Sequence, residues 1–174
     1  MEAQQYPIGR FQPEKETSKI IQTTHIDILE RFPQKLSEQV RSLHDHHWET
    51  SYRPGGWTAI QVVNHLADSH MHSYARFKHA LTEKKPTIKD YPEALWADLN
   101  EARQKDSITA SLQMITGIHF RWVGVLKTMT STDFEKSFYH PETQTHHRLH
   151  QALAYYSWHC GHHLGHLNLI ENKA

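Results

Sequence analysis

Apolar residues recur with a helical period over most of the chain, and this feature restricts the fold more than any other. They stand three or four residues apart in four long stretches separated by polar joints, and no stretch alternates as a half-buried strand does. With 174 residues, the chain is long enough for one substantial core. We therefore expect a single all-α domain over residues 1–174, built as a four-helix bundle.

The first two helices are expected on either side of the sharpest break in the chain, Pro54-Gly55-Gly56. The first should begin after Pro13, with a kink or a split at Pro33, because proline cannot donate the helical hydrogen bond. The second should begin at Thr58, whose side chain can cap the helix while Gln61, three residues on, completes a capping box.

The second half of the chain predicts two more long helices. One follows the polar break around Asp106 and carries apolar residues from 112 to 129, and a shorter helical stretch is expected within 92–103. The last helix should span roughly 147–171. The expected connections are residues 44–56, 83–92 and 138–145.

The balanced charge and the single cysteine argue against nucleic-acid and membrane partners and exclude an internal disulfide. Lys+Arg and Asp+Glu are balanced at 19 each, which gives no electrostatic reason to expect nucleic acid or an anionic membrane surface. No apolar run is long enough to span a bilayer, and the first residues lack the apolar core of a secretion signal. Cys160 is the single cysteine, so no internal disulfide can form, and we expect a cytoplasmic protein.

Histidine is the unusual residue type, with 17 copies, and four of them fall in the stretch WHCGHHLGHL at 158–167. With about 100° of rotation per residue, His159, His162, His163 and His166 lie on one side of the last helix. His163 falls within the apolar arc, His159 at its edge, and His162 leans away from it. Two imidazoles at positions i and i+4 can bind one metal ion together. Two such pairs overlap here, 159/163 and 162/166, and spacing alone does not choose between them.

A site with only two histidine ligands would hold a metal loosely, because catalytic zinc-type sites use three protein ligands and one open position. The best source of a third ligand is the segment NHLADSHMH at 64–72, which contains His65, His70 and His72. Periodicity favours His70, which lies nearer the middle of the apolar arc. His65 lies on one flank, although a flank of a bundle helix can also face the interior.

Several segments together resemble the YfiT-like branch of the DinB-like family. They are YRPGGWTAIQVVNHLADSHMHSYARFK at 52–78, FYHPETQ at 138–144 and YSWHCGHHLGHL at 156–167. YPIGRF at 6–11 and KPTIKDY at 85–91 agree with the same branch, so the resemblance covers nearly the whole chain.

The resemblance implies a DinB-like four-helix bundle, often a homodimer, with one divalent metal ion per chain, zinc or nickel, on three histidines. It places the first ligand at His65 and the second and third at His159 and His163. His65 thus replaces His70, which periodicity favours. His162 and His166 become neighbours of the site.

The same resemblance implies an enzyme, because this branch is described as metal-dependent hydrolases and some relatives resemble S-transferases that use bacillithiol. A metal ion on three neutral imidazoles keeps its full charge, and it lowers the pKa of a bound water to about 7, or activates a bound thiol. The residues do not distinguish the two nucleophiles. Hydrolase and thiol S-transferase therefore both stay open, each with a small-molecule substrate, and a non-catalytic metal-binding bundle is a third interpretation.

Two further residues have candidate roles near the predicted ligands. Asp68 lies three residues after His65, so it can share that helix face and orient a ligand or accept a proton. The simpler interpretation is a solvated surface carboxylate. Cys160 follows His159 directly, but adjacent helical residues point about 100° apart, and we expect a small buried thiol rather than a nucleophile.

Overall fold

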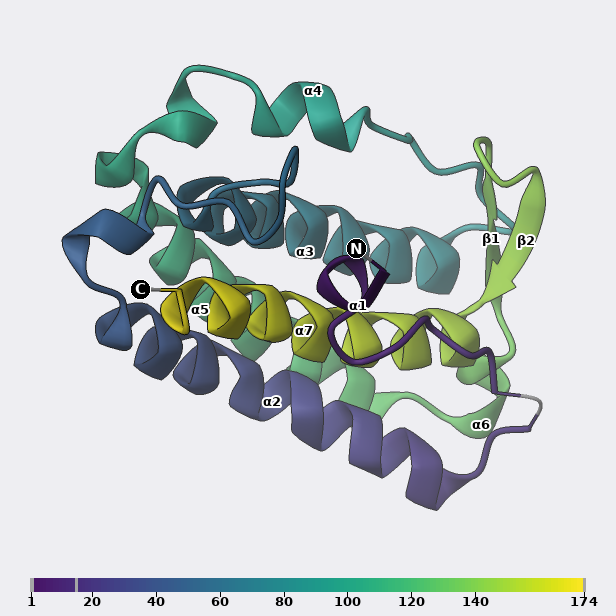
Figure 1. The fold of residues 1–174 in the computed structure, drawn as a ribbon. Coiled ribbons are helices and arrows are strands. Elements are labelled where there is room, and N and C mark those ends of the chain that lie inside the picture. Colours follow the sequence, from purple (N-terminus) through teal and green to yellow (C-terminus); the bar gives the residue numbers. More distant parts are fainter. Residues whose placement is uncertain (1, 15, 174) are drawn as a thin grey trace.

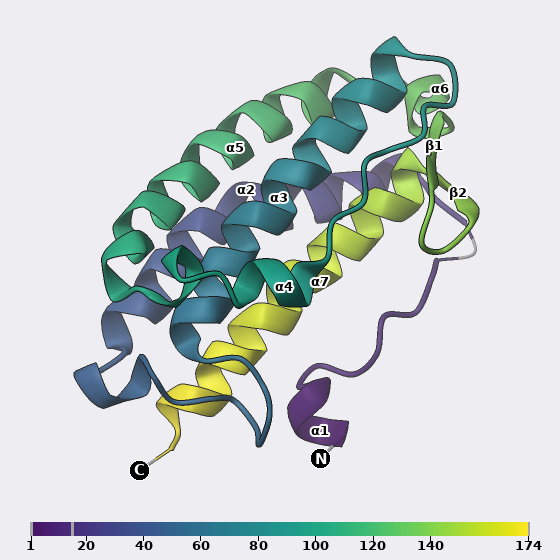
Figure 2. The ribbon, with the colours of Figure 1, turned by 90° about the horizontal axis from the view of Figure 1, so that it is seen from above.

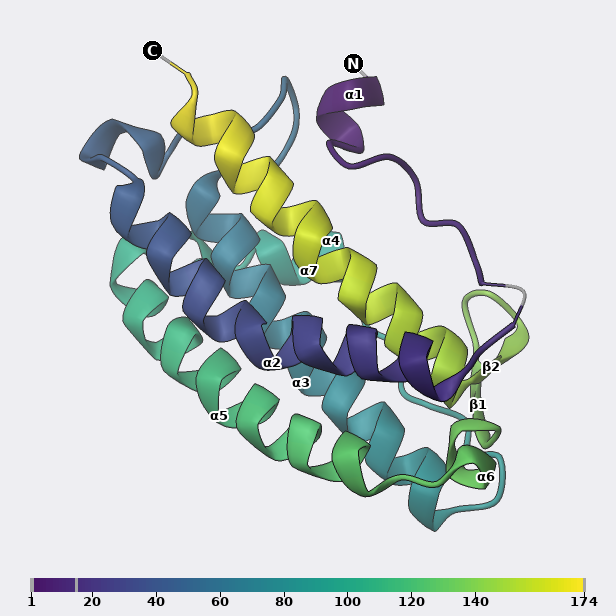
Figure 3. The same cartoon turned by 90° about the horizontal axis from the view of Figure 1, so that it is seen from below.

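The computed structural model describes residues 2–14 and 16–173, which form a bundle of four long helices (Figures 1 and 3). These are α2 (Lys19–Ser42), α3 (Ala59–Thr82), α5 (Ile108–Thr128) and α7 (Leu149–Glu171). α2 and α3 each pack against both α5 and α7, so consecutive long helices α2 and α3 occupy opposite corners of the bundle. The expected four-helix architecture is confirmed.

Short elements connect and cover the bundle. They are α1 (Glu2–Gln5), the 3-10 helices Asp45–His47, Glu101–Arg103 and Lys105–Ser107, α4 (Glu93–Ala97), α6 (Ser131–Phe134), β1 (Ser137–His140) and β2 (Thr145–Arg148).

α2 begins after Pro13 as expected, at Lys19, because Ser18 caps it by accepting a hydrogen bond from the Ile21 N–H. It continues, however, through Pro33 without a split. Its apolar face, with Leu29 and other residues at helical spacing, is fully buried against the bundle, and this packing holds the helix together across the proline.

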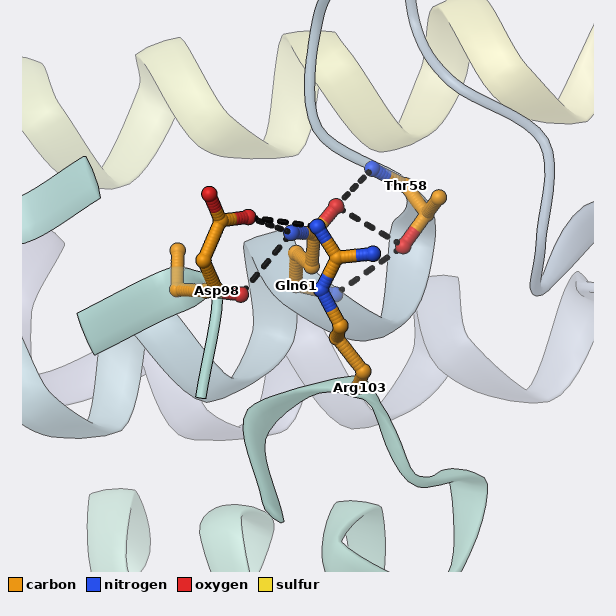
Figure 4. Close-up of polar contacts among 5 residues, drawn as sticks. Thr58, Gln61, Asp98 and Arg103 are labelled. Atoms are coloured by element: carbon orange, nitrogen blue, oxygen red, sulfur yellow. Dashed lines mark hydrogen bonds and ion pairs between the residues drawn. The ribbon is translucent and has the colours of Figure 1, made fainter. Parts of the chain in front are cut away.

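α3 begins where the sequence predicts. The Thr58 hydroxyl accepts from the Gln61 N–H at 3.3 Å, and the Gln61 side-chain oxygen accepts from the Thr58 N–H at 3.1 Å, which completes the capping box. Figure 4 shows that the same Gln61 side chain ties down the segment after α4. Its amide donates to the Ala97 carbonyl at 2.8 Å and to Asp98, whose carboxylate also accepts from Arg103 at 2.6 Å.

Residues 83–107 thereby lie along α3 instead of projecting into solvent. Figure 2 shows this segment crossing over α3, with α4 in its middle. One turn after Gln61, the Asn64 amide donates to the Ala102 carbonyl at 3.0 Å and to Ser107 at 2.7 Å. The segment covers the part of α3 that carries His65.

Part of the expected third connection forms a small hairpin. β1 and β2 pair antiparallel, with Phe138 opposite His147 and Tyr139 opposite His146. The aromatic residues of FYH suit a pleated, half-buried surface, and Phe138 is buried. The strand pairing delays the last helix, which begins at Leu149 rather than near 147.

Apolar side chains from all four long helices fill the core. No helix among the described residues is both long and apolar enough to cross a membrane. The largest completely buried side chains are Trp122, Phe32, Phe77, Leu29, Leu36, Leu66, Ile115, Leu126, Leu149, Leu153, Leu167 and Ile170.

Candidate metal centre

The histidine stretch of α7 faces inward. His159 and His163 are each 5% exposed and His166 is 2% exposed, so the interior side of α7 is lined by imidazole rings as well as by apolar residues. His162 lies at the edge of this side and is 9% exposed. Four rings within two turns therefore lose most of their contact with water.

His65 of α3 meets two of these rings. Its Nε2 lies 3.4 Å from the Nε2 of His159, which in turn lies 3.1 Å from the Nε2 of His163. One nitrogen from each of the three rings falls within 4.8 Å of the others, a spacing that a single metal ion could bridge. We call His65, His159 and His163 the three-histidine cluster.

His70, which periodicity favours as a ligand, lies directly behind the cluster. It is completely buried, and its Nε2 lies 3.3 Å from the Nδ1 of His159, on the side of that ring facing away from His65. His72 lies elsewhere and stacks on Tyr91, with ring centroids 4.2 Å apart. Both His65 and His70 face the interior because α3 packs against two neighbouring helices.

Burial keeps the cluster uncharged. It lowers the pKa of His65 to about 3, with the neighbouring His162 and His166 adding to the effect, and it lowers the pKa of His159 and His163 well below their ordinary value. At neutral pH each ring therefore has one N–H and one nitrogen lone pair, and the lone pair is what a metal ion binds.

A chain of hydrogen bonds fixes which nitrogen of His159 carries the hydrogen. The Leu29 carbonyl only accepts, so His119 donates its Nδ1–H to it at 2.6 Å. The bare Nε2 of His119 then accepts from His70 Nδ1–H at 2.7 Å, and the bare Nε2 of His70 accepts from His159 Nδ1–H at 3.3 Å. His159 thus directs a bare Nε2 at the cluster.

A second chain does the same for His163. The Gln5 carbonyl accepts from His166 Nε2–H at 3.2 Å, which leaves the Nδ1 of His166 bare. That nitrogen accepts from His163 Nδ1–H at 3.3 Å. His163 therefore also directs a bare Nε2 at the cluster.

The two chains make the cluster suitable for a cation. The Nε2 atoms of His159 and His163 lie 3.1 Å apart, and neither carries a hydrogen to bond the other. Two buried lone pairs facing each other repel, and a positive ion between them would remove this repulsion. The donor set of three imidazoles suits zinc, nickel and other transition metals.

Two other groups of potential ligands occur among the described residues. His162, His163 and His166 lie close together on α7, but the bond between the Nδ1 atoms of His163 and His166 already occupies two of their nitrogens. Asp90, His140 and Glu142 form the other group, which we call the hairpin cluster, and Glu142 in it is exposed.

Asp68 and Cys160 occupy different surroundings from the cluster. Asp68 is half-buried on α3, and burial together with the charge of Glu101 raises its pKa to about 6. No hydrogen bond joins it to a cluster histidine in the described part of the chain, so its role as a base or an orienting residue stays a prediction. Cys160 is 1% exposed, and burial raises its pKa well above the usual value, which confirms the expected small buried thiol.

The glycines of WHCGHHLGHL play a structural part that was not among the predictions from the sequence. Gly161 and Gly165 form a flat strip on α7 against which Pro7 and Ile8 pack (the N-terminal segment is visible in front of α7 in Figure 1). A Cβ added at Gly165 would come within 2.7 Å of the Pro7 ring. The indicator was present in the sequence: two small residues at i and i+4 beside a histidine stripe allow another segment to approach the helix closely.

Comparisons with known proteins agree with this fold. The model of the DinB superfamily matches residues 28–167. The YfiT protein of Bacillus subtilis (strain 168) is 42% identical over 168 residues, covering 97% of this chain and 94% of that protein. A Bacillus cereus (strain 03BB102) protein, which like YfiT is named a metal-dependent hydrolase, is 42% identical over 169 residues, covering 97% of this chain and 95% of that protein.

The solved structure of YfiT from Bacillus subtilis superposes with a TM-score of 0.93, at 42% identity, and covers 97% of this chain and 95% of that one. It is described as "a probable metal-dependent hydrolase with an unusual four-helix bundle topology". The fold and the histidine cluster define a helical-bundle protein with a candidate metal centre. The chain belongs to the DinB superfamily, and its relatives include YfiT.

Proposed function

We propose that this protein is a divalent-metal-dependent enzyme whose ion is held by His65, His159 and His163. The observation that carries the proposal is the pair of bare Nε2 atoms of His159 and His163, 3.1 Å apart and buried beside His65. A cation between these neutral imidazoles would remove the repulsion of their facing lone pairs. A role as a structural or storage site is weakened because the three ligands leave one position of a tetrahedral ion open.

We propose hydrolysis of a small-molecule substrate as the reaction, supported by the activity given for YfiT and its Bacillus cereus relative. A divalent ion on three neutral ligands supplies Lewis acidity and lowers the pKa of a coordinated water or thiol. The protein contributes three neutral ligands, and hydrogen bonds fix the tautomers of His159 and His163. Trp57, whose ring centroid lies 4.6 Å from that of His65, keeps that side apolar.

Zinc or nickel is the proposed ion, because imidazole nitrogen suits both and the described cluster contains no carboxylate or thiolate. Transfer of a low-molecular-weight thiol is the alternative reaction of the same centre, because a metal ion that activates water also activates a thiol. The two reactions differ in the nucleophile and not in the ligand set.

The test begins with the metal content of the purified, untagged protein by elemental mass spectrometry, beside the His65→Ala variant. We expect about one zinc or nickel ion per chain in the parent and most of it lost in the variant. His47→Ala, which removes a buried histidine outside the cluster, should keep the ion. Failure of the folded parent to take up either added ion would refute the proposal.

The loaded protein is then assayed against ester and amide substrates, with and without small thiols. Release of product without a thiol supports hydrolysis. Product formed only as a thiol adduct supports S-transfer, and the absence of both reactions over a broad substrate panel favours a non-catalytic metal protein.

A further inference from the structure

Pro33 stands in the middle of α2 and changes the hydrogen bonding of one buried carbonyl. Proline has no N–H, so the carbonyl oxygen of Leu29, four residues earlier, receives no hydrogen bond from its own helix. Leu29 is completely buried, so water does not replace the lost donor. His119 of α5 donates to this oxygen instead, at 2.6 Å.

We propose that Pro33, His119 and His70 are positioning residues that set the metal affinity of the three-histidine cluster through His159. The inference rests on the proposed function, because it assumes that His159 is a metal ligand. Pro33 leaves the Leu29 carbonyl on α2 free to accept a hydrogen bond from His119 on α5. His119 in turn accepts from His70 on α3, and His70 accepts from His159 on α7. All four long helices therefore contribute to the centre.

These hydrogen bonds determine the tautomer of His159 and the orientation of its ring. With His70 Nε2 accepting, His159 keeps its hydrogen on Nδ1 and presents a lone pair on Nε2. Without a fixed acceptor behind it, His159 is free to carry the hydrogen on Nε2, where it would block an ion. Partners of metal-bound histidines typically contribute ten- to hundred-fold to metal affinity.

The surroundings of His70 and His119 argue against a role in packing alone. Phe32 packs against both rings, with its centroid 5.2 Å from each, and Trp122 lies 6.2 Å from His70 and 5.9 Å from His119. Burial lowers the pKa of both histidines, which shows that the site is costly for a polar ring. An apolar side chain would avoid that cost, whereas only the imidazoles form the chain to His159.

The central test compares His119→Leu with His119→Gln. Leucine removes the acceptor for His70, and we expect zinc or nickel affinity, measured by competition with a chromogenic chelator, to fall about ten- to hundred-fold. Glutamine offers one acceptor and one donor, so it can replace both bonds of His119 and should keep the affinity within about three-fold. Equal affinity of the leucine variant and the parent would overturn the inference, and so would equal losses in both variants.

Two further variants separate positioning from stability. His47→Leu removes another buried histidine, which is 3% exposed and forms its hydrogen bonds with His44 and Lys173. It should leave metal affinity unchanged even where it lowers the unfolding midpoint. Pro33→Ala restores a helical N–H that competes for the Leu29 carbonyl. We expect it to raise the unfolding midpoint of the metal-free protein while lowering metal affinity a few-fold, a combination that a purely structural role does not produce. Unchanged affinity there would remove Pro33 from the proposal.

A measurement on the metal-free protein distinguishes failure of this inference from failure of the proposed function. Nitrogen-15 chemical shifts of the His159 ring report which nitrogen is protonated. We expect Nδ1–H in the parent and in His119→Gln, and a mixture of tautomers in His119→Leu. If the tautomers follow this expectation but the parent binds no metal, the proposed function is refuted while the hydrogen-bond series from Leu29 to His159 stands. If the parent binds metal but His159 has the same tautomer in all three proteins, the inference alone is refuted.

Discussion

Two regions of the molecule gather potential metal ligands, and they differ in burial and charge. The three-histidine cluster lies inside the bundle between α3 and α7, and its residues are 3–5% exposed. The hairpin cluster of Asp90, His140 and Glu142 lies at the edge, where Asp90 is partly buried and Glu142 is exposed. Their surroundings therefore stabilise different charge states.

An arginine outside the hairpin cluster already supplies a positive partner for it. Asp90 lies 3.9 Å from the Arg76 guanidinium and 3.7 Å from the Nε2 of His140, and water reaches the carboxylates. In the three-histidine cluster, by contrast, both hydrogen-bond chains place the hydrogen of the ring on Nδ1. Neither His159 nor His163 therefore has a hydrogen on the Nε2 that faces the other. The comparison teaches that unpaired lone pairs, rather than the number of nearby ligands, identify a cation site.

The largest expected effect is the loss of one cluster histidine. His159→Ala or His163→Ala should lower zinc or nickel affinity by at least about a hundred-fold, because two remaining imidazoles hold an ion loosely. Isothermal titration on each variant measures this. His162→Ala should cost little, and equal losses at all three positions would contradict the assignment.

Acidification should destabilise the protein, because its interior contains buried neutral histidines. Burial lowers the pKa of His119 from 6.5 to about 4, so between these values the unfolded chain binds more protons than the folded one, and stability falls as pH falls. From pH 6.5 to about pH 5, this one group should cost roughly 2 kcal/mol. Urea unfolding of metal-free protein at both pH values checks it. His119→Gln should reduce the pH dependence by about this amount while the other buried histidines keep the rest, and an unchanged pH slope in that variant would contradict the attribution.

A smaller effect is expected where the N-terminal segment covers α7. Gly165→Ala places a Cβ 2.7 Å from Pro7 and should destabilise the protein by roughly 1–2 kcal/mol, as overpacking does. It should also weaken metal binding a few-fold, because the Gln5 carbonyl anchors the chain to His163. Gly124→Ala, with open space around it on α5, is the matched control and should stabilise by about 0.5–1 kcal/mol. Similar unfolding midpoints for both variants would show that the segment is not packed there.

The smallest expected effect tests the hairpin cluster itself. His140→Ala should change metal affinity by less than about two-fold, since the Arg76 guanidinium, 3.9 Å from Asp90, already opposes the charge of that carboxylate. The same titration used for His159→Ala measures it. A large loss at His140 would show that the described hairpin cluster, and not the buried one, binds the ion.

Much of the fold follows from local pattern. Apolar spacing predicts the long helices, the pair Thr58 and Gln61 predicts the start of α3, and the inward side of α7 follows from its histidine and apolar arc. The choice between His65 and His70 does not follow from pattern, because α3 packs against two helices and both residues are buried. The resemblance to the YfiT-like branch named His65, and the structure places that residue beside His159 and His163.

The sequence by itself determined the helical class, the caps and the face of α7 on which the histidines lie, because these depend on residues within one or two turns of each other. Only the tertiary structure decided which histidines meet and where each hydrogen resides. Those outcomes depend on carbonyls and rings far apart in the chain: Leu29 with His119, and Gln5 with His166. Pro33 illustrates both levels, since its missing N–H is local while the donor that replaces it comes from another helix.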